Sequence, residues 1–179
     1  MASPTAFDAA CFPTRIVSGA LHHVDAERTR HVHGKKNEWD VVARAFRRYL
    51  AGEQRPPRHF HFTEAPGVCP VATPVDFDEL RAITYQCGLP VAGPPTPELD
   101  VVRLVLSDAA WTFFVASREE ARTLEEAWTA HLAGRAVERW AWGASAHTGT
   151  LLRRTWLVLA FDRLQAVTRA PLPSAQDPG

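Results

Sequence analysis

The chain has 179 residues, of which 46% are hydrophobic and 22% charged. This composition is typical of one soluble globular domain that is large enough for a continuous core. Lysine plus arginine and aspartate plus glutamate each number 20, so the formal net charge is zero. Bulk electrostatics therefore gives no case for a nucleic-acid or membrane partner, and a near-neutral surface favours self-association or a stable protein partner.

Cysteine usage and hydropathy indicate the compartment. Cys11, Cys69 and Cys87 are too few and too scattered for a disulfide framework or a zinc site of the CxxC type, so we expect reduced thiols. The first thirty residues contain no charged segment followed by an apolar run, and the longest apolar run, Trp156–Phe161, is far shorter than a membrane span. These features predict a cytoplasmic protein that does not contact a membrane.

The first half of the chain contains the clearest predicted element, a helix over residues 38–51. Asn37 is a suitable N-cap, Asp40 stands where a capping-box acid is expected, and Gly52 provides a left-handed stop. Apolar residues recur inside it at helical spacing. The remaining elements expected before residue 98 are a strand at 15–24, a charged connection at 25–36, a strand at 59–63, a helix at 75–87 and a proline-rich break at 90–97.

The second half alternates strands and one helix. Residues 99–106 and 111–116 predict an antiparallel hairpin, because both are apolar and rich in β-branched and aromatic residues. Ser117 is the expected N-cap of a helix that ends near Gly134. Strands are expected at 137–142 and 154–161, with a helix through Val167 as the alternative for the second.

This order of elements predicts an α+β fold. We expect a single domain over residues 14–169, in which a mixed, largely antiparallel sheet carries about three helices on one face. Residues 1–13 are expected to form a flexible arm and residues 170–179 a disordered tail, with a subdomain hinge at 90–97. No internal repeat is visible.

Two HxH pairs are the strongest hint of chemistry. His31 with His33, and His59 with His61, would each share one face of a strand, because alternate strand residues point the same way. If the two pairs converged, they could bind a divalent metal such as zinc or manganese. The alternative is that His59 and His61 form the polar face of a strand whose phenylalanines enter the core.

Two partial resemblances to known families involve these histidines. His31, His33 and Glu38 have the HxHx4E spacing that resembles the opening of the cupin metal motif, but the helix predicted at 38–51 stands where a cupin barrel needs a strand. His61-Phe62-Thr63 resembles one motif of the two-histidine phosphoesterases, which implies a bilobed α+β fold.

The second motif of that phosphoesterase pattern is incomplete. The later partner is His147-Thr148-Gly149, where glycine replaces the hydroxyl residue of the motif. The resemblance implies that His61, Thr63 and His147 act on a phosphodiester, with one histidine as general base and the other as general acid.

Two further groups are candidate binding residues. The only two lysines, Lys35 and Lys36, precede Asn37 and a helix N-terminus, where an anion such as phosphate could bind. The alternative is a solvated loop in front of a capped helix. The second group is expected to share one sheet face, which would serve for stacking nucleic-acid bases or for contacting a protein; it consists of Trp140, Trp142, Arg153 and Arg154.

We therefore expect a small binding module without catalysis of its own, such as a partner, immunity or accessory subunit. The alternative is a histidine-dependent phosphodiester hydrolase or nucleic-acid-processing enzyme, assisted by a metal. Convergence of the four paired histidines on one point would favour the enzyme.

Overall fold

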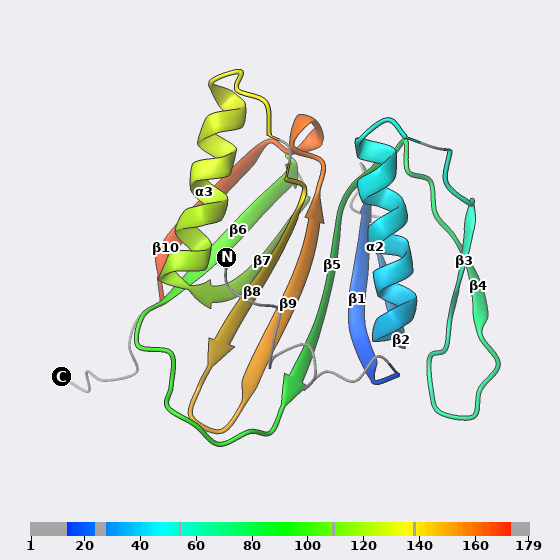
Figure 1. Cartoon of the computed structure of the whole chain (residues 1–179), viewed down its shortest axis with the longest axis horizontal. Coiled ribbons are helices and arrows are strands. Elements are labelled where there is room, and N and C mark those ends of the chain that lie inside the picture. Colours follow the sequence, from blue (N-terminus) through cyan, green and yellow to red (C-terminus); the bar gives the residue numbers. More distant parts are fainter. Residues whose placement is uncertain (1–13, 24–27, 54, 109, 138, 173–179) are drawn as a thin grey trace.

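The computed structural model describes residues 14–23, 28–53, 55–108, 110–137 and 139–172 (Figure 1). Within them lie two α-helices, α2 (Lys36–Leu50) and α3 (Arg118–Leu132), and one turn of 3₁₀ helix, η2 (Phe161–Arg163). The strands are β1 (Ile16–His23), β2 (Arg30–Lys35), β3 (His59–Phe62), β4 (Val71–Pro74), β5 (Leu80–Leu89), β6 (Leu99–Ser107), β7 (Ala110–Ser117), β8 (Ala141–His147), β9 (Leu152–Leu159) and β10 (Ala166–Pro171).

The strands form three antiparallel sheets. The central sheet has the order β2-β1-β5-β9-β8, and it is flanked by a three-stranded sheet, β10-β6-β7, and by the hairpin β3-β4. β7 lies beside β8 and β2 lies beside β3, so the three sheets follow one another in one row from β10 to β4 (Figure 1). The predicted α+β class and the antiparallel character of the sheet are confirmed.

Two buried apolar clusters lie on opposite faces of the central sheet. Tyr85 on β5 pairs with Trp156 on β9 and stacks on Trp39 of α2 at 5.6 Å between ring centroids. The next pair along the strands, Thr84 with Leu157, points the other way, and Leu157 belongs to the cluster under α3. The predicted placement of all helices on one face is therefore wrong, and the described residues contain two α-helices rather than about three.

The chain consists of two halves with the same order of elements, residues 16–89 and 99–171. Each half begins with a hairpin, β1-β2 or β6-β7, and the next residue starts a helix of 15 residues. A second hairpin follows, β3-β4 or β8-β9, and the last strand of each half returns to pair with the first. The structure therefore repeats its order of elements although no repeat is visible in the sequence.

The two halves also share a ring cluster under each helix. Phe77 and Phe161 occupy its centre, each followed by an aspartate in the sequences Phe-Asp-Glu-Leu and Phe-Asp-Arg-Leu. Phe77 lies 5.3–5.8 Å from three rings, those of Phe46, Tyr49 and Phe60. Phe161 lies 5.1–5.6 Å from the three rings in the corresponding places, those of Trp128, His131 and Trp142. Tyr49 donates to Asp78, and His131 lies 3.6 Å from Asp162.

The halves join through β5 and β9 and through one arginine. The β5–β9 pairing spans Ala82 to Leu89. Arg163, in the second half, donates to the carbonyl oxygens of Phe77 and Leu80 in the first. The proline-rich segment 90–97 is the connection between the two halves.

Several predicted elements differ from the structure. The helix expected at 75–87 is wrong, because Leu80–Leu89 is the middle strand of the central sheet. Its buried residues Ile83, Tyr85, Cys87 and Leu89 alternate with less buried ones, which is the period of a strand. The connection expected at 25–36 contains β2, whose Val32 and Gly34 face the core. The strand predicted at 137–142 begins at Ala141, and β9 is a strand rather than a helix.

The ends of the chain and its cysteines complete the comparison. Ala170 and Pro171, predicted as part of the tail, belong to β10, whereas 1–13 and 173–179 lie outside the described residues. Cys69 is free and exposed, but Cys87 forms a disulfide, so the expectation of reduced thiols is wrong for Cys87.

Candidate functional site

The two HxH pairs lie on different sheets. His31 and His33 are exposed on β2, at the edge of the central sheet, and His33 Nδ1 lies 3.4 Å from Ser18 Oγ. His59 and His61 are exposed on β3, whose Phe60 and Phe62 are buried, as the structural alternative predicted. Within the part of the chain that the structure describes, no group of three or more His, Cys, Asp or Glu side chains is placed to hold a metal ion.

The lysines before α2 are engaged within the fold. Lys35 is the N-cap of α2, so the predicted N-cap Asn37 is wrong and lies exposed in the first turn. Lys36 Nζ donates to Asp40 at 2.8 Å and lies 4.9 Å from the ring centroid of Trp156. Because the N-cap lies two residues earlier than predicted, Glu38 and not Asp40 occupies the capping-box position. Asp40 instead accepts from Lys36 and from Tyr85.

Thr63 serves a structural contact. Its hydroxyl donates to Glu38 Oε1 at 2.6 Å, and its backbone N–H donates to Glu38 Oε2 at 2.8 Å. His61 lies on β3, whereas His147 ends β8, and the Nδ1 of His147 accepts from the N–H of Gly149 at 2.9 Å. The counterpart of Thr63 in the second half is Ser145, which makes the same contacts with Glu120.

The glutamate at the third position of each helix therefore fastens the helix to a strand. Glu38 accepts from the N–H of Lys35 and from Thr63, and Glu120 accepts from Ser117 and from Ser145. In both halves the strand residue, Thr63 or Ser145, lies 25 residues after the glutamate. Burial by itself raises the pKa of Glu38, but the hydrogen bonds from Thr63 and Lys35 outweigh it, so the pKa lies below its ordinary value. These carboxylates fix the entry of each helix.

The tryptophans predicted to share a sheet face belong to different clusters. Trp142 is buried beneath α3, and Arg139 lies over its ring at 5.7 Å. Trp140 precedes β8 and packs against the cluster under α2. Arg153 is exposed on β9, while Arg154 turns to Glu120 at 3.7 Å. The structure thus does not bring these four residues together.

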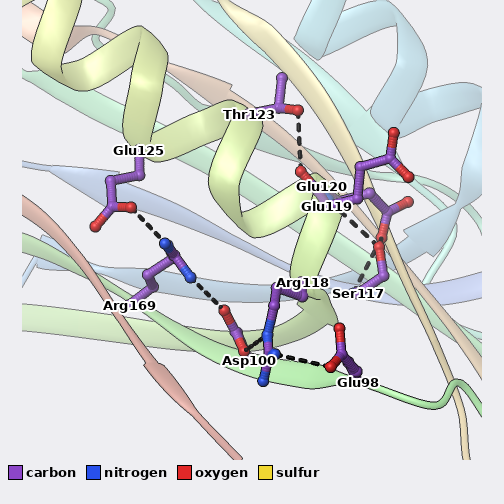
Figure 2. Close-up of polar contacts among 9 residues, drawn as sticks. All are labelled: Glu98, Asp100, Ser117, Arg118, Glu119, Glu120, Thr123, Glu125 and Arg169. Atoms are coloured by element: carbon purple, nitrogen blue, oxygen red, sulfur yellow. Dashed lines mark hydrogen bonds and ion pairs between the residues drawn. The ribbon is translucent and has the colours of Figure 1, made fainter.

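One buried charge ties β10, β6 and α3 to each other. Asp100 is fully buried on β6, and Figure 2 shows its carboxylate between Arg118 of α3 and Arg169 of β10. Arg169 donates to it at 2.8 Å and also contacts Glu125, and Arg118 also donates to Glu98. The buried carboxylate of Asp100 therefore has an arginine on each side, which compensates its charge. The role of this network is to hold the three elements together.

A cleft lies beside the C-terminal end of α2. It has a volume of about 630 Å³ and is bordered by arginines, among them Arg30, Arg55 and Arg58, and by the carboxylates of Asp76, Asp78 and Glu79. Asp78 accepts from Tyr49, and Glu79 pairs with Arg28. Its charges of both signs do not select one class of ligand, and of the predicted site residues only His59 borders it.

An exposed apolar surface lies on the face of the β10-β6-β7 sheet that points away from α3. Trp111 and Phe113 are 53% and 60% exposed there, with ring centroids 5.8 Å apart. Strand alternation and register place on the same face Leu99, Val101, Val105, Val115, Ala166, Thr168 and Ala170. We call this the outer face; its one charged strand residue is Arg103, 4.8 Å from the centroid of Trp111.

The outer face was missed in the sequence because both faces of β6 and β7 are apolar. The run from Leu99 to Ser117 predicts a hairpin but does not show which side lacks a cover. The signal that could have identified it is the pair Trp111 and Phe113, since two large rings at strand spacing on a short hairpin next to a polar turn indicate a second apolar side.

Comparison with protein-family models, with curated proteins and with solved structures found no match to this chain. Of the helices in the described segments, neither is long and apolar enough to cross a membrane.

Proposed function

We propose that this protein is a binding module that recognises another protein through the outer face. The observation that carries the proposal is the exposed pair of Trp111 and Phe113 on an apolar sheet face with a single charge, Arg103. Aromatic residues and arginine are enriched at the energetic centres of protein interfaces, and a contiguous exposed apolar patch is rare on monomeric proteins.

Packing on this face supports a rigid binding surface. The main chain of β6 and β7 is paired along both strands, and their inner side chains, such as Leu104 and Phe114, are buried under α3. The guanidinium of Arg103 is held over the indole of Trp111, where cation–π attraction restricts it. A partner therefore loses little side-chain entropy at this surface, which favours affinity.

The charge on the face favours a different protein over a second copy. Arg103 lies on β6, the middle strand of the three-stranded sheet. A twofold contact centred on this strand would bring Arg103 close to its own copy, and like charges in a desolvated interface are costly. A partner with apolar side chains around a carboxylate complements the face instead.

The test begins with the purified chain and three variants. Trp111→Ala with Phe113→Ala removes the aromatic centre, Arg103→Glu reverses the charge, and Leu132→Ser removes an exposed apolar residue on α3 as the matched control. Proteins captured by the wild type and by Leu132→Ser, but not by the other two, are then purified and their dissociation constants measured.

We expect the double variant to weaken such a complex by about 30-fold or more, as loss of a hot spot does. A carboxylate-to-lysine change in the partner should restore binding to Arg103→Glu. Equal binding by all variants would contradict the proposal, as would a wild-type dimer in sedimentation that the double variant dissociates.

A further inference from the structure

The cleft beside the C-terminal end of α2 has the size of a small-molecule site. Its volume of about 630 Å³ lies inside the range of about 300–1,000 Å³ found for sites of drug-sized ligands. All the residues that border it belong to the first half of the chain, between His23 and Glu79, whereas the outer face belongs to the second half. The cleft is therefore separate from the surface proposed for a protein partner.

The charges of this cleft have both signs, but their pairing in the fold separates them. Asp78 accepts from Tyr49, and Glu79 pairs with Arg28. Asp76 accepts from the N–H of Asp78 through its Oδ1, at 3.0 Å. Each of the three carboxylates that border the cleft thus already has a partner within the fold.

Three arginines that border the cleft have no such partner. Arg30, Arg55 and Arg58 are exposed, and within the residues that the structure describes none of their side chains makes a hydrogen bond, an ion pair or a ring contact. Since the carboxylates are engaged and these guanidinium groups are not, the contacts that remain to be made in the cleft are those of donors with positive charge.

A pair of prolines places two of these arginines on the same side. Pro56 and Pro57 fix their φ angles at about −65°, and a residue before a proline is restricted to an extended conformation. A segment extended in this way completes a turn every three residues, so Arg55 and Arg58 point in the same direction. The carbonyl oxygen of Arg58 accepts from the N–H of Val75 at 2.9 Å, which fixes the end of the segment beside the β3-β4 hairpin.

The third arginine comes from a neighbouring strand. Arg30 is the first residue of β2, and β2 lies beside β3, which begins one residue after Arg58 (Figure 1). Two separate segments of the chain therefore bring guanidinium groups to one cleft.

The second half of the molecule indicates that the fold itself does not need these charges. Thr63 and Ser145 are equivalent, since each follows its capping glutamate by 25 residues. The positions eight and five residues before Thr63 hold Arg55 and Arg58. The same positions before Ser145 hold apolar residues that pack against the buried clusters, Val137 and Trp140.

We infer that this cleft binds a nucleoside monophosphate. The planar guanidinium groups match the oxygens of a phosphate with paired N–H···O bonds. The rings of Pro56, Pro57 and Pro74 provide an apolar wall for the base. Asp76 Oδ2, which makes no hydrogen bond within the described residues, accepts from an amino group of the base. The two signs of charge thus serve the two ends of one ligand, and the site does not depend on the proposed protein partner.

Isothermal titration calorimetry of the full chain with AMP tests the site. AMP is expected to bind at one site per chain, and adenosine, which lacks the phosphate, should bind about tenfold or more weakly. Inorganic phosphate should compete with AMP, because it occupies the same guanidinium groups. Oligo(A) offers the same base with phosphodiesters in place of a phosphate monoester, and it should bind more weakly than AMP.

Two pairs of arginine variants separate the cleft from bulk charge. Arg55→Gln with Arg58→Gln should lower the affinity for AMP by about 30-fold or more, without a change in melting temperature, because these side chains have no partner in the fold. Arg44→Gln with Arg47→Gln removes the same charge from exposed positions of α2 outside the cleft, and it should change the affinity by no more than about twofold.

Asp76→Asn tests the other end of the ligand. The amide keeps an oxygen for the N–H of Asp78 but loses the charge, so AMP should bind about fivefold more weakly while inorganic phosphate does not. A carboxylate that only repelled the phosphate would give the opposite result, tighter binding of both.

Several results would overturn the inference. One is the absence of saturable heat with AMP at millimolar concentration, and another is adenosine or oligo(A) binding as tightly as AMP. An equal loss of affinity in the two arginine pairs would mean that bulk charge attracts the nucleotide. A lowered melting temperature in Arg55→Gln with Arg58→Gln would assign these arginines to the stability of the fold, and tighter AMP binding by Asp76→Asn would remove the contact with the base.

Discussion

The two halves of the molecule agree under their helices and differ on the opposite face of their sheets. Both place a capping glutamate on a strand hydroxyl and a phenylalanine at the centre of three rings. On the side away from the helix, the first half carries Ser18, Ala20, His22, His31, His33 and Thr84. The corresponding register positions of the second half are Val101, Arg103, Val105, Phe113, Val115 and Thr168.

This difference distinguishes the contacts that hold each half together from the surface that each half exposes for binding. The shared contacts lie where a helix must be fastened to a sheet, so they are the same in both halves whatever the surroundings. The face away from the helix is not needed to hold the helix, and it has become polar and histidine-rich in one half and aromatic in the other.

Removing the central ring of each cluster is the strongest test of whether the two clusters are equivalent. Phe77→Ala and Phe161→Ala should each lower the free energy of unfolding by about 3–5 kcal/mol, the cost of a cavity left by a buried aromatic ring. Urea denaturation of both variants measures this. A loss below 1 kcal/mol at either position would mean that the two clusters are not equivalent.

The histidine face makes the first half sensitive to mild acid. His22 titrates near 6.5 in an unfolded chain and at about 4 in the native protein, because burial, His31 and His23 disfavour its charged form. Between these pH values the unfolded state binds more protons, so stability falls as pH falls from 7 to 4, by on the order of 3 kcal/mol.

The corresponding position in the second half is Val105, which does not titrate. His22→Gln should therefore flatten the stability profile between pH 7 and pH 4, while His131→Gln, a histidine of the second half, should leave its slope in place. Chemical denaturation at several pH values measures both. A slope unchanged in His22→Gln would contradict the prediction.

The capping glutamates offer a matched pair of smaller effects. Glu38→Gln and Glu120→Gln keep the shape of the side chain but lose charge-assisted hydrogen bonds, which should cost about 1–2 kcal/mol each at pH 7. The pKa of Glu38 is lowered in the folded state, so its contribution is complete above the ordinary value of 4.5 and is lost as pH falls through the folded value.

The difference in stability between the wild type and Glu38→Gln should accordingly shrink in acid. Urea denaturation at pH 7 and below pH 4 measures it. Thr63→Val and Ser145→Ala, which remove the strand partners, should each reproduce part of the loss. An undiminished difference in acid would mean that the carboxylate charge is not what fastens the helix.

Much of this architecture could be predicted from the local pattern of apolar and polar residues, but the function of the protein could not. The amphipathic helix at 38–51 and the hairpin of β6 and β7 carry their own periodicity, so their existence was predictable. In β5, the buried residues Ile83, Tyr85, Cys87 and Leu89 keep the alternation that marks a strand, so this element was predictable although the helix expected at 75–87 missed it.

The repeat could not be seen in the sequence because residues at corresponding positions make the same contacts but differ in type. Tyr49 corresponds to His131, and Phe46 to Trp128, so each ring contact is kept while the residue changes. Whether the two HxH pairs converge could not be predicted either. Strand alternation correctly placed His31 and His33 on one face, but only the strand register shows that this face adjoins Thr155 and not His59.

The outer face should show the smallest effect on stability, which is what distinguishes it from the ring clusters. Trp111 is more than half exposed, so Trp111→Ser should change the free energy of unfolding by no more than about 0.5 kcal/mol. Trp128→Ser, at a buried ring of the same half, should cost several kcal/mol by the cavity mechanism. Parallel urea denaturation of the two variants measures both, with tryptophan fluorescence replaced by circular dichroism because each change removes a fluorophore. A large loss of unfolding free energy in Trp111→Ser would mean that the Trp111 ring and Arg103 stabilise the sheet itself. Their exposure would then be no argument for a protein partner.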